Sequence, residues 1–286
     1  MPNTRDLIVS TQIQVLVYGR FKLGKTWGAL TFPRPNVIDF DHGIRTVINP
    51  EFVKRYGLRS IEYFQPVRNL DGKGVPKDYN AIDAACKYFD DWMTPARRDK
   101  FDTWVLDSAT TLIDASTDKA ILLLGGKDFK GAGSTTLEEA RRYGLISPKI
   151  QDYGAERSMT EQIIRMLVDS DKHVVVICHE REQTNDGGNV TGIVPLLTGK
   201  SVEDVPIMFD EVYRLMARPV GTTVVRELRT VPIGGMKVGS RLGVPDGTPW
   251  DYESLLKVIT SIRTEQQKLL QAASQLAPAS TNPPVA

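Results

Sequence analysis

The sequence predicts an α/β domain with a mostly parallel central sheet. Apolar runs of four to six residues alternate with helix-like stretches, which is typical of parallel strands joined by helices. Two later segments, 211–217 and 222–230, are rich in β-branched residues with no helix between them, and they predict an antiparallel extension of the sheet. Hydrophobic residues make up 41% of the chain and charged residues 25%, an ordinary globular composition that excludes a collagen-like or disordered protein.

The short apolar runs give the expected parallel strands in order: 14–18, 36–40, 61–64, 103–106 and 173–178. The stretches between and after them give the expected helices: 26–30, 79–92, 110–124, 150–170 and 255–270. Apolar residues at helical spacing form a one-sided stripe on 150–170: Met159, Ile163, Met166 and Leu167. We expect one core domain at 1–260, followed at 261–286 by the end of the last helix and a disordered tail.

The charge balance and the cysteine content limit the classes of function. With 36 basic and 35 acidic residues the formal net charge is +1, which excludes a constitutively polybasic nucleic-acid binder. Two cysteines are too few for a disulfide framework, so a reduced, cytoplasmic setting is expected. The apolar runs are strand-sized, and no secretion signal or membrane partner is expected.

The strongest motif is a glycine-rich loop that follows the first strand. Residues 19–26 fit the pattern G-x-x-x-x-G-K-[ST] without a mismatch. In such a loop, backbone N–H groups and a helix N-terminus bind phosphate, the lysine reaches the β- and γ-phosphates, and the hydroxyl holds magnesium. The expected nucleotide-binding residues are Gly19, Arg20, Phe21, Lys22, Leu23, Gly24, Lys25, Thr26 and Trp27. The structural alternative is an ordinary strand–turn–helix with a buried glycine pair.

A second magnesium anchor is expected at the end of a neighbouring strand. The apolar run 103–106 ends in Asp107 and Ser108, so Asp107 could orient a magnesium-bound water while Thr26 holds the ion directly. The alternative is that Asp107 caps the helix that starts near Ala109.

Hydrolysis also needs a group that positions water. Asp39 and Asp41 stand at alternate positions where the second strand ends, and Asp41 is preferred because it lies at the strand's exit. The alternative is a turn formed by Asp41, His42 and Gly43. His179 ends the strand at 173–178, where a polar side chain could contact the γ-phosphate, although it could equally be structural or exposed.

These motifs together resemble the RecA-like P-loop ATPase core, and most of all its small phage-encoded relatives, the Sak-type single-strand annealing ATPases and phage nucleotide-binding proteins of AAA type. The resemblance covers roughly residues 14–244. It rests on the phosphate loop, on Asp39-Phe40-Asp41-His42, on Asp107-Ser108 and on Cys178-His179. The family's base is usually glutamate and its sensor often glutamine, where this chain has Asp41 and His179.

The same resemblance places two DNA-binding loops at 125–136 and 182–192, with Lys127, Lys130 and Arg181 as the nearby cations. Their glycines and amides could hold a sugar–phosphate backbone, although two merely flexible surface loops remain the alternative. Residues 214–241 carry six basic residues and one acidic residue, a net +5. Within this basic segment Lys237 and Arg241 resemble the family's residues that reach a neighbouring subunit's nucleotide, although solvated strand positions would look the same.

The sequence therefore predicts a magnesium-dependent ATPase whose cofactors are ATP and Mg²⁺. The expected partners are single-stranded DNA, a single-strand-binding protein and further copies of the chain in a ring or filament. The expected task is phage-type homologous recombination or single-strand annealing, with DNA-stimulated hydrolysis. The alternatives are a P-loop motor of another task, such as a helicase, helicase loader or packaging ATPase, and a nucleotide-gated scaffold with little hydrolysis.

Overall fold

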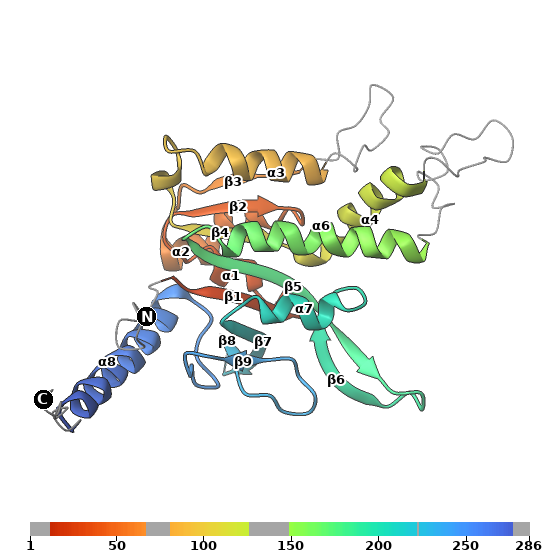
Figure 1. Cartoon of the computed structure of the whole chain (residues 1–286). Coiled ribbons are helices and arrows are strands. Elements are labelled where there is room, and N and C mark those ends of the chain that lie inside the picture. Colours follow the sequence, from red (N-terminus) through yellow and green to blue (C-terminus); the bar gives the residue numbers. More distant parts are fainter. Residues whose placement is uncertain (1–11, 67–80, 126–148, 222, 277–286) are drawn as a thin grey trace, which may run out of the picture.

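A computed structural model of the chain describes residues 12–66, 81–125, 149–221 and 223–276. Its strands form one sheet in the order β3-β2-β4-β5-β1-β7-β8 (Figure 1). The strands are β1 Gln14–Gly19, β2 Pro35–Asp39, β3 Glu62–Phe64, β4 Thr103–Asp107, β5 His173–Thr184, β6 Val190–Pro195, β7 Glu211–Val220, β8 Thr223–Arg229 and β9 Gly239–Ser240. Strands β1 to β5 and β7 pair in parallel, whereas β6 is antiparallel to β5, and β8 and β9 are antiparallel to β7. The predicted fold class is confirmed.

Helices cover both faces of the sheet. They are α1 Lys25–Ala29, α2 Pro50–Tyr56, α3 Ala81–Trp92, α4 Ala109–Ala120, α6 Ile150–Val168, α7 Ser201–Ile207 and α8 Tyr252–Leu276. Shorter turns of helix are Gly43–Ile48, Arg98–Lys100 and Ile121–Gly125. One core joins α3, α4, α6 and α7 to one face of the sheet, and the other joins α1, α2 and α8 to the opposite face.

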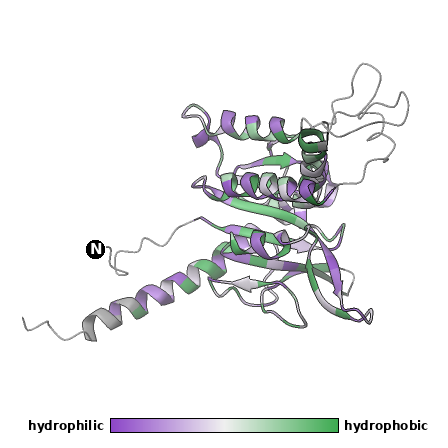
Figure 2. Ribbon diagram, turned by 45° about the vertical axis from the view of Figure 1, so that its right-hand side comes forward, coloured by the Kyte–Doolittle hydropathy of each residue, from purple (hydrophilic) through white to green (hydrophobic). Residues whose placement is uncertain are grey.

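The central strands are apolar throughout because both of their faces are buried. Val174 and Val176 of β5 belong to the core under α6, whereas Val175 and Ile177 belong to the core under α1. Figure 2 shows these strands as hydrophobic, while α8 is mainly hydrophilic where it leaves the sheet. The parallel strands end at one edge, which therefore collects the polar residues that come after them.

The predicted stripe on α6 is only partly buried. Ile163 and Leu167 are buried, but the N-terminal half of the helix buries polar residues instead: Asp152, Glu156 and Thr160. Thr160 bonds Ser116 of α4, and Glu156 accepts from Thr198, so these polar groups are satisfied by neighbours that periodicity does not show.

The predicted loop at 182–192 is wrong. Strand β5 continues to Thr184 and pairs with β6, so the segment is a β-hairpin that projects from the sheet (Figure 1). Its residues are exposed on both sides, which is why the sequence has no apolar alternation there. The Asn185 side chain closes the turn by accepting from the N–H groups of Gly187 and Asn189.

The last helix is longer than predicted. Because α8 continues to Leu276, the expected boundary between residues 260 and 261 falls within a helix. The predicted tail and Lys127 and Lys130, with nearly all of the predicted loop at 125–136, lie outside the described residues. Among the helices in the described ranges, none has the length and apolarity needed to cross a bilayer.

Trp250, which precedes α8, fixes the helix that follows the phosphate loop. Its indole N–H donates to the Lys25 carbonyl at 2.9 Å, and the ring lies so close to Gly28 that a Cβ there would overlap it. Trp250 is buried and also packs on Phe32, 6.0 Å between ring centroids. The glycine in α1 is therefore explained by this contact.

We expect Trp250→Ala to lower the free energy of unfolding by about 3–5 kcal/mol, because it leaves a cavity against α1. Denaturant unfolding of the two proteins measures the difference. Trp250→Phe, which keeps a ring but loses the bond to Lys25, should cost less. Equal stability of Trp250→Ala and wild type would show that this contact does not hold α1.

Candidate active site

The phosphate loop lies between β1, which ends at Gly19, and α1, which begins at Lys25. Gly24 precedes the helix with φ 95°, a left-handed conformation that glycine adopts without strain. Successive N–H groups of such a turn can point toward one anion.

Lys25 is folded over this loop. Its side chain is buried, with the residue only 6% exposed, and Nζ donates to the carbonyls of Gly19 at 2.9 Å and Arg20 at 2.8 Å. Burial lowers the pKa of Lys25, while the nearby Asp107 and Asp41 act in the opposite direction. An anion in the loop would give this buried ammonium a further partner of opposite charge.

Thr26 and Asp107 meet at the predicted magnesium position. Thr26 Oγ1 donates to Asp107 Oδ2 at 2.6 Å, and a side chain at Gly43 would overlap that carboxylate. Helix α4 is capped by Ser108, which accepts from the Thr111 N–H, so Asp107 is not the cap. A hydroxyl and a carboxylate suit Mg²⁺. Within the described ranges no three His, Cys, Asp or Glu residues gather to hold a metal, so phosphate and water would complete the shell.

Burial raises the pKa of Asp107 to about 7 from an ordinary 3.8. Between these values the folded chain keeps a proton that the unfolded chain has released. Without Mg²⁺, we therefore expect this group's contribution to the free energy of unfolding to fall by about 1.4 kcal/mol per pH unit up to about pH 7, and then to stay constant. Urea unfolding of wild type and Asp107→Asn from pH 5 to 8 measures this contribution. A difference between the two proteins that does not change with pH would contradict the burial effect.

Asp41 and His179 face each other beside this pair. His179 Nε2 lies 3.3 Å from Asp41 Oδ2, and the Thr111 hydroxyl donates to the other carboxylate oxygen. Burial alone would raise the pKa of Asp41, but hydrogen bonds from His179, Thr111 and Ser108 bring it below its ordinary value. Asp41 is therefore a carboxylate that stays ionised at neutral pH.

Asp39 has a different place. Its carboxylate accepts from the N–H groups of Gly43 at 2.8 Å and Ile44 at 3.1 Å, and from Gln65 at 2.9 Å. These bonds hold the turn after β2, so of the two acids Asp41 is the one that faces the site.

The predicted residues surround one cavity of about 670 Å³. Its lining contains these residues that the sequence indicated: Phe21, Lys22, Gly24, Lys25, Thr26, Trp27, Asp41, Asp107 and His179. It also contains residues that no sequence pattern indicated: Gly43, Thr46, Asn49, Glu51 and Arg226. Gly19, Arg20 and Leu23 do not line it; their carbonyls instead accept from Lys25 and Arg226.

Residues 11–242 of the sequence match the AAA domain family, a span that includes every residue of this cavity. The chain belongs to the AAA domain family. This AAA domain protein is therefore a P-loop protein of an ATPase family, with the phosphate loop and Asp107 in the expected arrangement.

Comparison of the AAA domain protein with curated proteins found no match. Among solved structures it is similar to the KaiC-like protein PH0186 from Pyrococcus horikoshii OT3, with 11% identity, 76% of each chain covered and a TM-score of 0.35. It is also similar to the RadB recombinase, with 18% identity, 78% of this chain and 84% of that chain covered and a TM-score of 0.38.

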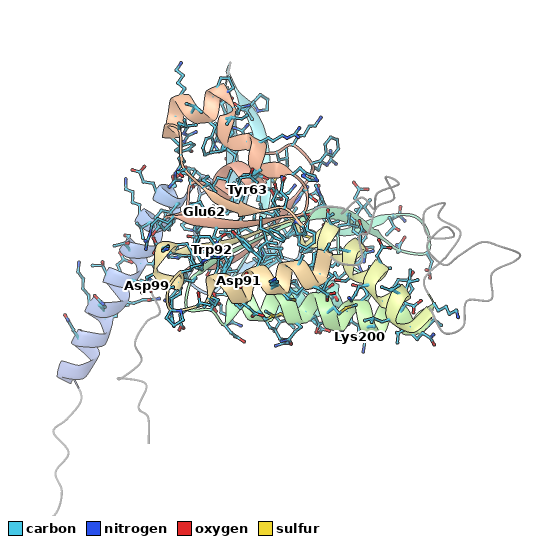
Figure 3. The ribbon with its side chains drawn as sticks, turned by 90° about the horizontal axis from the view of Figure 1, so that it is seen from above. Glu62, Tyr63, Asp91, Trp92, Asp99 and Lys200 are labelled. Atoms are coloured by element: carbon cyan, nitrogen blue, oxygen red, sulfur yellow. The ribbon has the colours of Figure 1, made fainter. Side chains whose placement is uncertain are left out.

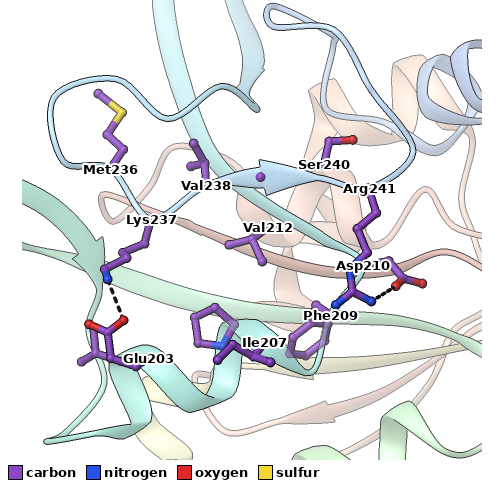
Figure 4. A pocket seen from close by; sticks show the side chains of 13 residues that line it. Glu203, Ile207, Phe209, Asp210, Val212, Met236, Lys237, Val238, Ser240 and Arg241 are labelled. Carbon is purple, nitrogen blue, oxygen red and sulfur yellow. Dashed lines mark hydrogen bonds and ion pairs between the residues drawn. The ribbon is translucent and has the colours of Figure 1, made fainter.

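Lys237 and Arg241 of the AAA domain protein line a different cavity, of about 530 Å³ (Figure 4). Lys237 pairs with Glu203 at 2.6 Å and Arg241 with Asp210 at 2.8 Å. Neither residue lines the chain's own phosphate-loop cavity. Arg181 lines a third hollow, between α6 and the segment before α7.

Proposed function

We propose that the protein hydrolyses ATP with Mg²⁺ bound by Thr26 and Asp107. The observation that carries this proposal is that Lys25, Thr26, Asp107, Asp41 and His179 line one cavity at the carboxyl edge of the sheet. In P-loop enzymes the ion neutralises charge on the phosphates. Lys25 would bind the β- and γ-phosphates through an ammonium that is already desolvated.

Asp41 would orient the attacking water. Its carboxylate is held in place by Thr111 and His179, and its depressed pKa keeps it able to accept a hydrogen bond from water at neutral pH. His179 lies at the end of the apolar part of β5, so its position can change when the γ-phosphate leaves. The adjacent Glu180 pairs with Arg20 of the phosphate loop at 3.3 Å and with Arg214 at 2.8 Å, which joins β5 to the loop by a second route.

We further propose that single-stranded DNA binds at the hollow of about 460 Å³ beside α6, referred to here as the α6 groove. Arg181 and Lys200 line it, both are exposed, and neither has an ion-pair partner within the described ranges. Tyr153, 45% exposed, adds a ring on which a base could stack. Figure 3 shows Lys200 on the side of α6, away from Glu62 and Tyr63 of the edge strand. Arg181 follows His179 by two residues, which supports a link between nucleotide and DNA.

We expect the double variant Arg181→Ala, Lys200→Ala to bind a fluorescent oligothymidine more weakly and with a salt dependence smaller by about two phosphate contacts. Fluorescence anisotropy with ATP over a range of salt concentrations measures both. Arg98→Ala, Lys100→Ala removes two exposed cations near the opposite end of β4 and is the matched control. Unchanged binding by the first variant would exclude the α6 groove, and no binding by wild type would exclude DNA as the partner.

The proposed biological task is phage-type recombination or single-strand annealing, together with a single-strand-binding protein and in a homo-oligomer. Lys237 and Arg241 support the oligomer, because they lie outside their own chain's ATP cavity and are available to act on a neighbour's. Annealing of complementary oligonucleotides would support this task. ATP-driven unwinding of a duplex would support a helicase instead, and slow hydrolysis unchanged by DNA would support a nucleotide-gated scaffold.

A further inference from the structure

Arg226 reaches the phosphate loop from a distant part of the fold. It lies on β8, in the antiparallel extension, and its Nε donates to the Leu23 carbonyl at 3.0 Å. Its guanidinium carbon lies 5.0 Å from the centre of the Trp27 ring. Its side chain also lies directly against Gly24, where a Cβ would come within 2.5 Å of Nε. The contacts of Arg226 are thus all with the loop and with the first turn of α1.

The other arginines of this hairpin differ from Arg226 in one respect. Arg214 pairs with Glu180, Arg218 with Glu227 and Arg229 with Asp246. Arg226 has no acidic partner among the described residues, although it is only partly exposed and lines the same cavity as Lys25. A guanidinium carries five N–H donors, and the bond to Leu23 uses one. The remaining N–H groups are therefore available to an anionic ligand in the cavity.

The contacts in the cavity fall into two clusters. Asp107, Asp41 and His179 are joined to Thr26 by successive hydrogen bonds, and this cluster surrounds the proposed site of hydrolysis. Arg226 instead contacts Leu23, Gly24 and Trp27. Arg226 is thus placed to contact the part of a nucleotide that both ATP and ADP contain.

We propose that Arg226 is a nucleotide-binding residue that contacts the α- and β-phosphates of nucleoside di- and triphosphates in its own chain. This inference rests on the proposed ATP site and adds to it a second cation, delivered by the β7–β8 hairpin. Because ADP and ATP share these phosphates, Arg226 contributes to the affinity for both and little to the rate of hydrolysis. The hairpin is consequently held against the phosphate loop more firmly when nucleotide is bound.

Titration calorimetry with ADP, ATP and adenosine tests this proposal. We expect Arg226→Met, which keeps the apolar stem over Trp27, to weaken ADP and ATP by similar factors of at least about tenfold, since each hydrogen bond to a charged group is lost. Adenosine binding should not change, and Arg226→Lys should recover part of the loss. Arg218→Met, on the same hairpin but paired with Glu227, is the matched control and should bind as wild type does.

Three results would overturn the inference. Normal ADP binding by Arg226→Met, with wild-type unfolding behaviour, would show that Arg226 does not contact nucleotide. A loss confined to ATP would place it at the γ-phosphate, and an equal loss for adenosine would place it at the nucleoside. If the wild type binds neither ADP nor ATP, the proposed function itself fails, and that result is distinct from the other three.

Discussion

Replacing Lys25 by alanine is expected to lower ATP hydrolysis by at least about 100-fold. The reason is the burial of the ammonium: Nζ contacts only the two loop carbonyls at Gly19 and Arg20 and stands where phosphate charge would lie. In a desolvated site such a charge stabilises the transition state more than the same charge in water does. Release of phosphate from ATP under saturating Mg²⁺ measures the effect.

Two controls separate this effect from a loss of folding. Lys54→Ala removes an exposed lysine of α2 and should hydrolyse ATP at the wild-type rate. The unfolding transition of Lys25→Ala should remain cooperative. A Lys25→Ala protein that folds and keeps full activity would show that residues 19–26 are not the catalytic phosphate loop.

The second large effect is expected for Asp41→Asn. This change keeps the shape of the side chain but removes the charge that orients water, so we expect kcat to fall by about 10²–10⁴-fold. The affinity for ATP should not weaken, because Asp41 is an anion and does not attract phosphate. Single-turnover hydrolysis together with equilibrium binding of ATP measures the two quantities separately.

Asp91→Asn, an exposed change of the same kind on α3, is the control for Asp41→Asn. If Asp41→Asn kept the wild-type rate, the water would have to be oriented by another group. Asp39 could not take over without breaking the turn, since its oxygens already accept from Gly43, Ile44 and Gln65.

The parallel sheet and the hydrolytic half of the site were predictable for the same physical reason. Strands buried on both faces are apolar runs in the sequence, and the residues directly after each run lie at one edge of the sheet. Asp41, Asp107 and His179 each come at the end of such a run, and the structure brings them together.

The parts that were not predicted depend on contacts between distant segments or on exposed strands. Arg226 bonds Leu23 across 203 positions and Trp250 bonds Lys25 across 225, and no local pattern marks either contact. The β5–β6 hairpin is polar on both sides, so its alternation carries no signal. Arg226 had one weak indication, its place in the basic segment at 214–241, which does not show which arginine lacks an acidic partner.

The most direct test of the function is ATP hydrolysis by the wild type with Mg²⁺, measured with and without single-stranded DNA and repeated with Lys25→Ala. We expect hydrolysis by the wild type, a severalfold increase with DNA, and almost none by Lys25→Ala under either condition. Wild-type turnover that DNA does not change, or turnover that survives the loss of Lys25, would contradict a phosphate-loop ATPase that couples its nucleotide to single-stranded DNA.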